Sequence, residues 1–224
     1  MSIQLNLNKI KSEITASCEK SGKKAENVKI VAVTKTRTPA QINEVIDLGI
    51  TDIGENRVQE LLEKYDKVKS GANWHIIGHL QTNKVKYIAD KVSMIQSVDS
   101  LKLALEIEKQ CSKLGKLMDI LIEVNSGEEN KNGVAYGEAI SLVEEVSKLK
   151  FVRIKGLMTM APLGAPEEEL RKVFSSLREL SEEIKLRNFP GVFMEELSMG
   201  MSGDYKIAVE EGATIIRPGR SLFE

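Results

Sequence analysis

Short apolar runs alternate along the chain with segments in which apolar residues recur at helical spacing. The runs are rich in β-branched residues and predict strands. There are eight of them, at residues 28–35, 51–55, 74–79, 93–98, 118–125, 153–160, 192–199 and 213–218. The polar and amphipathic stretch ahead of the first run predicts an additional N-terminal helix.

Two of the predicted helices carry start signals. Thr38, Pro39 and Gln41 have the spacing of an N-cap, a first-turn proline and a capping box, and Gly49 is placed to end that helix. A later helix begins after Pro166, where three glutamates suit the positive end of the helix dipole. Its apolar face is formed by Leu170, Val173, Phe174, Leu177, Leu180 and Ile184.

Eight strand–helix units in 224 residues predict a (β/α)8 barrel, slightly shorter than the usual length of about 250 residues. A doubly wound open sheet is the alternative, because the same alternation builds both folds. The count of eight favours the barrel, as does the absence of a GxGxxG motif after the first strand. With no internal repeat or linker, residues 1–224 are expected to form a single domain.

Composition narrows the classes of function. The formal net charge of −1 argues against a nucleic-acid partner, and the apolar runs are too short for a membrane span. The N-terminus lacks the apolar core of a signal peptide. Cys18 and Cys111 have neither disulfide nor metal spacing, and His75 and His79 lack a third ligand, so no metal site is expected. We therefore expect a soluble, cytoplasmic protein.

The candidate chemistry follows the strand ends, because the active site of such a barrel lies at the carboxyl ends of its strands. Reading those ends in order gives Lys35, Glu55–Asn56, His79, Ser97, Asn125, Thr159, Ser198 and Arg217. The stretch from Glu123 to Gly133 is expected to be a long loop, either solvated or acting as a lid. Trp74 is expected to pack in the barrel.

Lys35 has the most suggestive position. Val31, Val33 and Lys35 share one face of the first strand, so the amine projects into the barrel mouth if the valines fill the interior. A desolvated lysine at this position could form a Schiff base with a carbonyl ligand. The alternative is a lysine that simply reaches solvent.

Two loops favour a phosphorylated ligand. Residues 197–204 follow the seventh strand with small residues and two hydroxyls, and residues 216–221 follow the eighth with a glycine and two arginines. Barrels commonly bind phosphate with these two loops. Backbone N–H groups and fixed cations are the donors that such a group needs.

Six motifs together resemble a known family. They are VAVTKT (31–36), GENRVQE (54–60), WHIIGHLQTNK (74–84), GLMTMAP (156–162), LSMGMSGD (197–204) and IRPGRSLF (216–223). In this order they resemble the pyridoxal phosphate homeostasis proteins, single-domain relatives of the alanine racemase N-terminal barrel. The resemblance implies a fold-type III barrel that binds pyridoxal 5′-phosphate.

The resemblance also implies roles for individual residues, none of them catalytic. Lys35 resembles the Schiff-base lysine, and Arg217 the arginine that faces the pyridine nitrogen. Asn56 and His75 resemble neighbours of the cofactor ring. The residues expected near the phosphate are Ser198, Met199, Gly200, Ser202, Gly219 and Arg220. Two positions depart from the family pattern: Arg220 stands where a small hydroxyl residue is common, and Glu224 replaces a common glycine.

Three functions are compatible with these residues. The first is a protein of vitamin B6 homeostasis that holds pyridoxal phosphate and buffers it or delivers it to apo-enzymes, as a monomer or weak dimer. The second is an amino-acid racemase using the same cofactor, and the third an aldolase-type enzyme using Lys35. Racemisation is disfavoured because related racemases take a second acid/base group from a C-terminal β-domain, which is not expected after Glu224.

Overall fold

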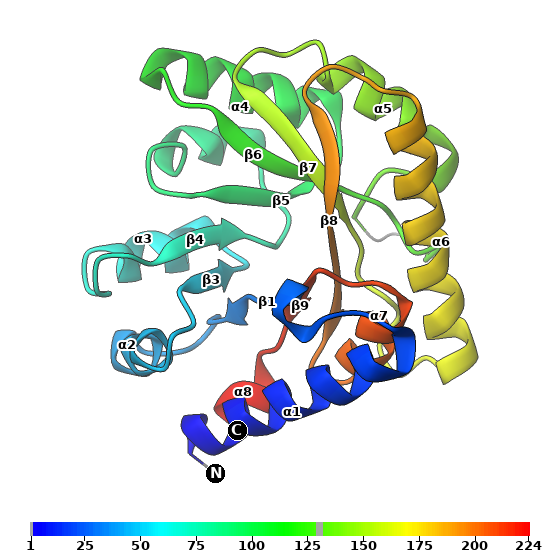
Figure 1. Ribbon diagram of the computed structural model, residues 1–224. Coiled ribbons are helices and arrows are strands. Elements are labelled where there is room, and N and C mark those ends of the chain that lie inside the picture. The colour runs from blue at the N-terminus through cyan, green and yellow to red at the C-terminus, as the bar shows by residue number, and fades with distance from the viewer. Residues whose placement is uncertain (1, 129–131) are drawn as a thin grey trace.

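The computed structural model describes residues 2–128 and 132–224, which form a barrel of parallel strands surrounded by helices (Figure 1). Within these residues nine strands are hydrogen-bonded in the order β1-β9-β8-β7-β6-β5-β4-β3-β2. This architecture confirms the predicted (β/α)8 barrel. The strands are β1 (Lys29–Ile30), β2 (Ala32–Val33), β3 (Asp52–Glu55), β4 (Asn73–Ile76), β5 (Met94–Val98), β6 (Met118–Glu123), β7 (Val152–Met158), β8 (Val192–Met201) and β9 (Ile215–Arg217).

The first predicted strand closes the barrel and accounts for the extra strand in the count. Its run is divided at Val31 into β1, which pairs with β9, and β2, which pairs with β3. The Val31 N–H donates to the carbonyl oxygen of Ile216 at 2.9 Å, so hydrogen bonding toward β9 continues past the division. One continuous stretch of chain therefore pairs with the last strand on one side and with the next strand on the other.

The helices cover the outside of the barrel (Figure 1). They are α1 (Ile3–Ser21), α2 (Pro39–Asp47), α3 (Val58–Tyr65), α4 (Leu101–Leu114), α5 (Ala139–Val146), α6 (Glu167–Leu186), α7 (Tyr205–Glu211) and α8 (Arg220–Phe223). Short 3₁₀ helices lie at Ala25–Asn27, Thr82–Tyr87 and Tyr136–Glu138. The one at Thr82–Tyr87 stands where the repeat would place an α-helix after β4.

Helix α1 is the additional N-terminal helix that the sequence predicts. It packs against α7 and α8, so the first and last helices of the chain lie together (Figure 1). The Asn6 side chain is buried there and donates to the carbonyl oxygen of Leu222 at 3.1 Å. None of the helices in the described part of the chain is long and apolar enough to cross a membrane.

The start of α2 follows the predicted capping box. Thr38 Oγ1 accepts from the Gln41 N–H at 3.3 Å, and Gln41 Oε1 accepts from the Thr38 N–H at 3.0 Å. At each of the two residues, the backbone N–H and a side-chain oxygen thereby have a hydrogen-bond partner. The helix ends before Gly49, which has a φ of 88°.

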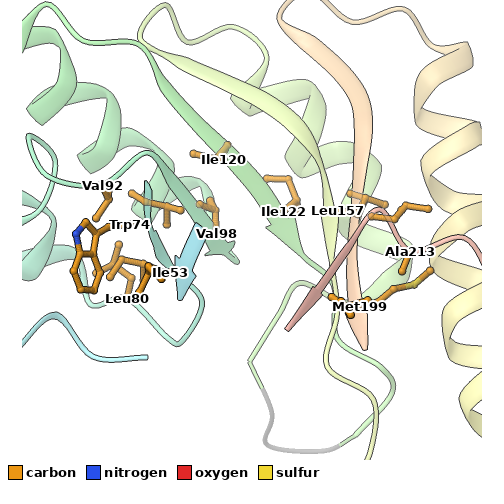
Figure 2. Close-up of a cluster of buried hydrophobic side chains, with 14 of the residues drawn as sticks. Ile53, Trp74, Leu80, Val92, Val98, Ile120, Ile122, Leu157, Met199 and Ala213 are labelled. Carbon is orange, nitrogen blue, oxygen red and sulfur yellow. The ribbon is translucent and has the colours of Figure 1, made fainter. Parts of the chain in front are cut away.

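The core has two layers. The outer layer lies between strands and helices and includes Trp74, which is buried and has the ring of Tyr65 at 6.2 Å (Figure 2). The predicted packing role of Trp74 is therefore confirmed. The inner layer fills the barrel with the buried side chains of Val31, Met94, Leu121, Met158 and Ile215.

Candidate functional site

A pocket of about 840 Å³ opens at the carboxyl ends of the strands. Its wall contains residues from the end of β2, β3, β4, β6, β7, β8 and β9, or from the loops that follow them. Six of the ten residues predicted to bind the cofactor lie in this wall: Lys35, Asn56, Ser202, Arg217, Gly219 and Arg220.

Lys35 reaches the pocket by the alternation predicted for its strand. Val31 is buried in the inner core layer, and Val33 and Lys35 line the pocket above it. The Lys35 residue is exposed, which agrees with the alternative of a lysine that reaches solvent. The lysine follows the regular part of the strand, where the chain turns outward through Thr36 with a φ of 64°.

Two charged side chains of α3 hold the backbone on either side of Lys35. The Lys64 ammonium donates to the Thr34 carbonyl oxygen at 2.8 Å, and the Thr36 N–H donates to Glu60 Oε2 at 3.0 Å. Bonds to both neighbours restrict the turn that carries Lys35.

Glu55 and Asn56, at the end of β3, play different parts. Glu55 is fully buried and accepts from Lys64 at 2.7 Å and from the Thr34 hydroxyl at 2.7 Å. Burial raises the pKa of Glu55 and these bonds oppose the shift. Asn56 lines the pocket, and its buried Oδ1 has no hydrogen-bond partner among the described residues. That atom is an acceptor available to a ligand.

Arg217 lies at the pocket wall on the last strand and is 3% exposed. Its guanidinium donates to Ser198 Oγ at 2.6 Å and to the Thr159 carbonyl oxygen at 2.7 Å. Burial lowers the pKa of Arg217 to about 10, while the carboxyl groups of Glu123 and Asp204 oppose that shift. The guanidinium therefore remains protonated at neutral pH.

Glu123 is a pocket residue that the sequence interpretation missed. It is 2% exposed, and its Oε2 has no hydrogen-bond partner among the described residues. Burial raises the pKa of Glu123 to about 7; Asp99 adds to the shift and Arg217 opposes it. The period of two offered a signal, because Leu121 fills the barrel interior and Glu123 follows on the same face.

Ser202 joins the two loops that were predicted to bind phosphate. Its Oγ accepts from the backbone N–H of Gly219 at 3.0 Å and of Ser221 at 3.1 Å. Both backbone N–H groups thus donate to the Ser202 hydroxyl oxygen. A side chain added at the neighbouring Gly203 would meet nothing within 4 Å, so there is space beside this junction.

His75 and Ser198 do not line the pocket. The His75 side chain is buried inside the barrel, with Nε2 at 3.0 Å from Asp52 Oδ1 and Nδ1 at 2.9 Å from Gln96 Nε2. Ser198 is also fully buried, between Gln96 and Arg217. The direct cofactor contacts expected of these two side chains therefore do not enter the proposed site.

Met199 and Gly200 point away from the pocket as well. Met199 is buried in the outer core layer beside Ala213 (Figure 2). Gly200 has a φ of 92°, and a Cβ there would lie 2.6 Å from the Cβ of Ala208 and 2.8 Å from the Cα of Tyr205. Gly200 therefore lies at a close approach between β8 and α7, and its place near the phosphate stays a prediction.

The loop after β6 borders the pocket at both of its ends, through Ser126 and Asn132. Residues 129–131, which include Lys131 of the predicted solvated loop or lid, lie outside the described residues. In the described ranges no group of three or more histidine, cysteine, aspartate or glutamate side chains is arranged to hold a metal ion.

A parallel barrel with a lysine after its first strand and a buried arginine on its last is the architecture of an alanine racemase-type barrel. The family model for the alanine racemase N-terminal domain matches residues 5–224. The alanine racemase of Clostridium difficile superposes with a TM-score of 0.76 at 17% identity, over 99% of this chain and 56% of that one. At this identity the likeness concerns the fold alone.

Closer relatives define the family. The pyridoxal phosphate homeostasis protein of Aquifex aeolicus is 43% identical over 97% of this chain and 95% of its own, and that of Synechocystis is 37% identical over 88% and 91%. The structure of PipY from Synechococcus elongatus with PLP bound has a TM-score of 0.88 at 31% identity and full coverage of both chains. The chain belongs to the family of pyridoxal phosphate homeostasis proteins.

Proposed function

We propose that this protein binds pyridoxal 5′-phosphate reversibly and serves its homeostasis by buffering or delivering it. The observation that carries the proposal is Lys35, which lies at the mouth of the barrel in one pocket with Arg217. Membership of the pyridoxal phosphate homeostasis family supports the same function, as does a relative of known structure with PLP bound.

The residues of the pocket fit this cofactor. Lys35 offers an amine for its aldehyde, Asn56 an unpartnered buried acceptor, and Arg217 a buried cation. The pocket wall around Ser202 and Gly219 offers small residues and, as a donor to the phosphate, the Ser202 hydroxyl, whose oxygen already accepts from the Gly219 N–H. When bound, the cofactor supplies an aldehyde carbon that forms a C=N bond with Lys35 Nζ, with loss of one water molecule.

Arg220 also lines the pocket, where many family members carry a small hydroxyl residue. The Arg220 side chain is longer than a small hydroxyl residue and carries a positive charge. We therefore propose that it contributes charge, in place of a hydroxyl contact, to phosphate binding. Glu224, the second departure, accepts from Arg37 at 2.5 Å. This ion pair ties α8 to the turn that follows Lys35.

We further propose that the protein has little or no turnover on amino acids. Racemisation needs an acid/base group on each face of the substrate. Lys35 is one such group, but the described residues lining the pocket include no histidine, cysteine or tyrosine. The remaining candidates, Glu123 and Asp204, both face the charge of Arg217. Arg217 donates hydrogen bonds but does not readily release a proton.

The surroundings of this function are also proposals. Buried free thiols at Cys18 and Cys111 suit the reducing cytoplasm. Apo-enzymes that use the same cofactor are its expected recipients. We treat residues 1–224 as a single binding domain that acts as a monomer or weak dimer, which sedimentation at two protein concentrations would test.

Borohydride reduction followed by peptide mapping tests the assignment of Lys35. Protein loaded with pyridoxal phosphate is expected to carry the reduced label on Lys35, and Lys35→Ala is expected to lose the near-visible absorption band. Lys24→Ala, which changes an exposed surface lysine, serves as the matched control and keeps the band. Recovery of the label mainly on another lysine would contradict the assignment.

A further inference from the structure

A line of five hydrogen-bonded side chains crosses the interior of the barrel. Arg217 donates to Ser198 Oγ at 2.6 Å, and Ser198 Oγ lies 2.6 Å from Gln96 Oε1. Gln96 Nε2 lies 2.9 Å from His75 Nδ1, and His75 Nε2 lies 3.0 Å from Asp52 Oδ1. The line starts at the pocket wall, passes through β9, β8, β5 and β4, and ends at the start of β3.

The chemistry of the first residue sets the direction of every bond. A guanidinium can only donate, so Ser198 Oγ accepts from Arg217 and its own hydrogen is directed to Gln96 Oε1. The amide NH₂ of Gln96 then faces His75 and donates to Nδ1. Nδ1 must therefore be unprotonated, and the imidazole carries its hydrogen on Nε2, which donates to Asp52.

A protonated His75 is incompatible with this arrangement. Both ring nitrogens would then be donors, and Gln96 would have to turn its oxygen toward His75. Its NH₂ would then donate to the second lone pair of Ser198 Oγ, and the serine hydrogen would lose Gln96 as its acceptor. Leaving a buried polar group unpaired is unfavourable, so the neutral ring is favoured.

The far end of the line suits the same direction. Burial opposes the ionisation of Asp52, but the hydrogen bond and charge that His75 can offer, the charge of Lys29 and the bond from Asn73 hold its pKa below the usual value. Asp52 accepts from the Nε2–H of His75 whether the ring is neutral or charged, so the state of Nδ1 is decided at Gln96. The line therefore runs from a buried cation to a carboxylate. Gln96 is the link that fixes its direction, because its amide has one accepting and one donating end.

We propose that Gln96 is a positioning residue for Arg217, acting through Ser198, and that it holds the guanidinium at the pocket wall by requiring a neutral His75. This inference rests on the proposed function, in which Arg217 contacts the bound cofactor. Gln96 and His75 do not line the pocket, so their effect on binding passes through Arg217.

The histidine tautomer tests the direction of the line without any cofactor. The chain has two histidines, so a two-bond proton–nitrogen NMR spectrum of the rings is simple to assign. His75 is expected to be neutral with its hydrogen on Nε2, and the ring of His79, half-exposed beside Asp99, provides the second set of signals for comparison. A charged ring or a hydrogen on Nδ1 in His75 would overturn the proposal.

Two substitutions of Gln96 separate its two ends. Gln96→Glu places acceptors on both sides, so it keeps the bond to Ser198 and is expected to make His75 protonated and charged. Gln96→Leu removes both bonds and is expected to raise the Kd for pyridoxal phosphate about tenfold, with a shifted absorption maximum of the bound cofactor. A neutral His75 in Gln96→Glu would also contradict the proposal.

Substitutions of Ser198 provide the rescue. Ser198→Ala is expected to weaken cofactor binding like Gln96→Leu, whereas Ser198→Thr retains a hydroxyl and restores the absorption maximum. Ser181→Ala, at a buried serine of α6, controls for lost stability alone. If the tautomer is as expected but Ser198→Ala and Gln96→Leu bind with wild-type Kd and spectrum, the positioning role is wrong. If wild-type protein binds no cofactor, the proposed function fails instead.

Discussion

Glu123 is the pocket residue whose side chain is most at odds with its surroundings. It combines near-complete burial, an oxygen without a partner and a position on the carboxyl end of β6. Two charged neighbours have opposite effects on its pKa, because Asp99 disfavours the ionised form and Arg217 favours it. Burial is the larger effect, so the protonation of Glu123 changes near neutral pH.

This residue links stability to pH. Its pKa is about 7 in the folded protein against 4.5 for an ordinary glutamate, so the folded state binds more protons between these values. Stability is therefore expected to fall as pH rises from about 4.5 to 7. Glu123→Gln removes this effect and should be about 3 kcal/mol more stable than wild type at pH near 8, with the gain vanishing near pH 4.

Urea denaturation at both pH values measures the difference. Glu26→Gln, at an exposed glutamate, is the control and should change little at either pH. A Glu123→Gln variant that is less stable than wild type at the higher pH would show that the carboxylate is held by its neighbours rather than penalised by burial.

Ser202 is the residue whose loss should separate recognition of the phosphate from recognition of the ring. Ser202→Ala leaves the N–H groups of Gly219 and Ser221 without their acceptor and removes a hydroxyl from the pocket wall. We expect binding of pyridoxal phosphate to weaken about tenfold and binding of pyridoxal, which is weaker from the outset, to change little. Titrations with both aldehydes measure this. An equal loss for both would mean that Ser202 acts on the pocket as a whole.

Among the elements, those with a strong local signal were predicted and those decided by distant partners were not. The capping box of Thr38 and Gln41 marked the start of α2 because its bonds are local. The division of the first strand at Val31 depends on which strands lie on either side, and no local pattern shows that. The alternation of side chains along the first strand predicted that Lys35 would project into the mouth of the barrel, on the same face as the valines.

The same limit applies to the site. Lys35, Asn56 and Arg217 were found because strand ends are visible in the sequence. Glu123 was missed because the run 118–125 was expected to end at Asn125, two residues beyond the last residue of β6. The sequence predicted that His75 and Ser198 lie beside the cofactor, yet both side chains lie within the barrel interior. A strand's alternation indicates which side chains point inward, but not how deep in the barrel they lie.

The capping box of α2 permits a direct test of a local element. Thr38→Ala removes the acceptor of the Gln41 N–H, and it is expected to cost about 1 kcal/mol in the free energy of unfolding. Thr15→Ala, on the exposed face of α1, is the control and should cost little. Thermal or urea unfolding gives both values, and equal costs would mean that the box contributes nothing beyond helix propensity.

The contact between β8 and α7 permits a second test. Gly200→Ala meets both an unfavourable backbone conformation and the atoms of Ala208 and Tyr205, so it is expected to cost more than about 2 kcal/mol. Gly22→Ala has a φ of 67° but open space around it, so only the conformational cost of about 1–2 kcal/mol remains. If the two variants are equally stable, the approach of β8 to α7 is not as close as described.

At the scale of the whole molecule, the described residues that line the pocket include one amine, Lys35, and one buried guanidinium, Arg217. Loaded protein incubated with L-alanine in deuterated water is therefore expected to show little exchange of the α-proton. Mass spectrometry and chiral chromatography follow exchange and racemisation. Rates near the usual enzymatic range of about 1–1000 per second would establish catalysis and contradict the proposed lack of turnover.

The pairing of β1 with β9 has a consequence for the order of assembly during synthesis. Lys35 is synthesised well before the strand that completes its barrel, Ile215–Arg217. Before β9 has been made, the nascent chain contains Lys35 but neither the pairing of β1 with β9 nor the Arg217 guanidinium that shares its pocket. The proposed capture of the aldehyde in this pocket therefore requires β9 to be in place, so the amine acquires its surroundings only after β9 has been made.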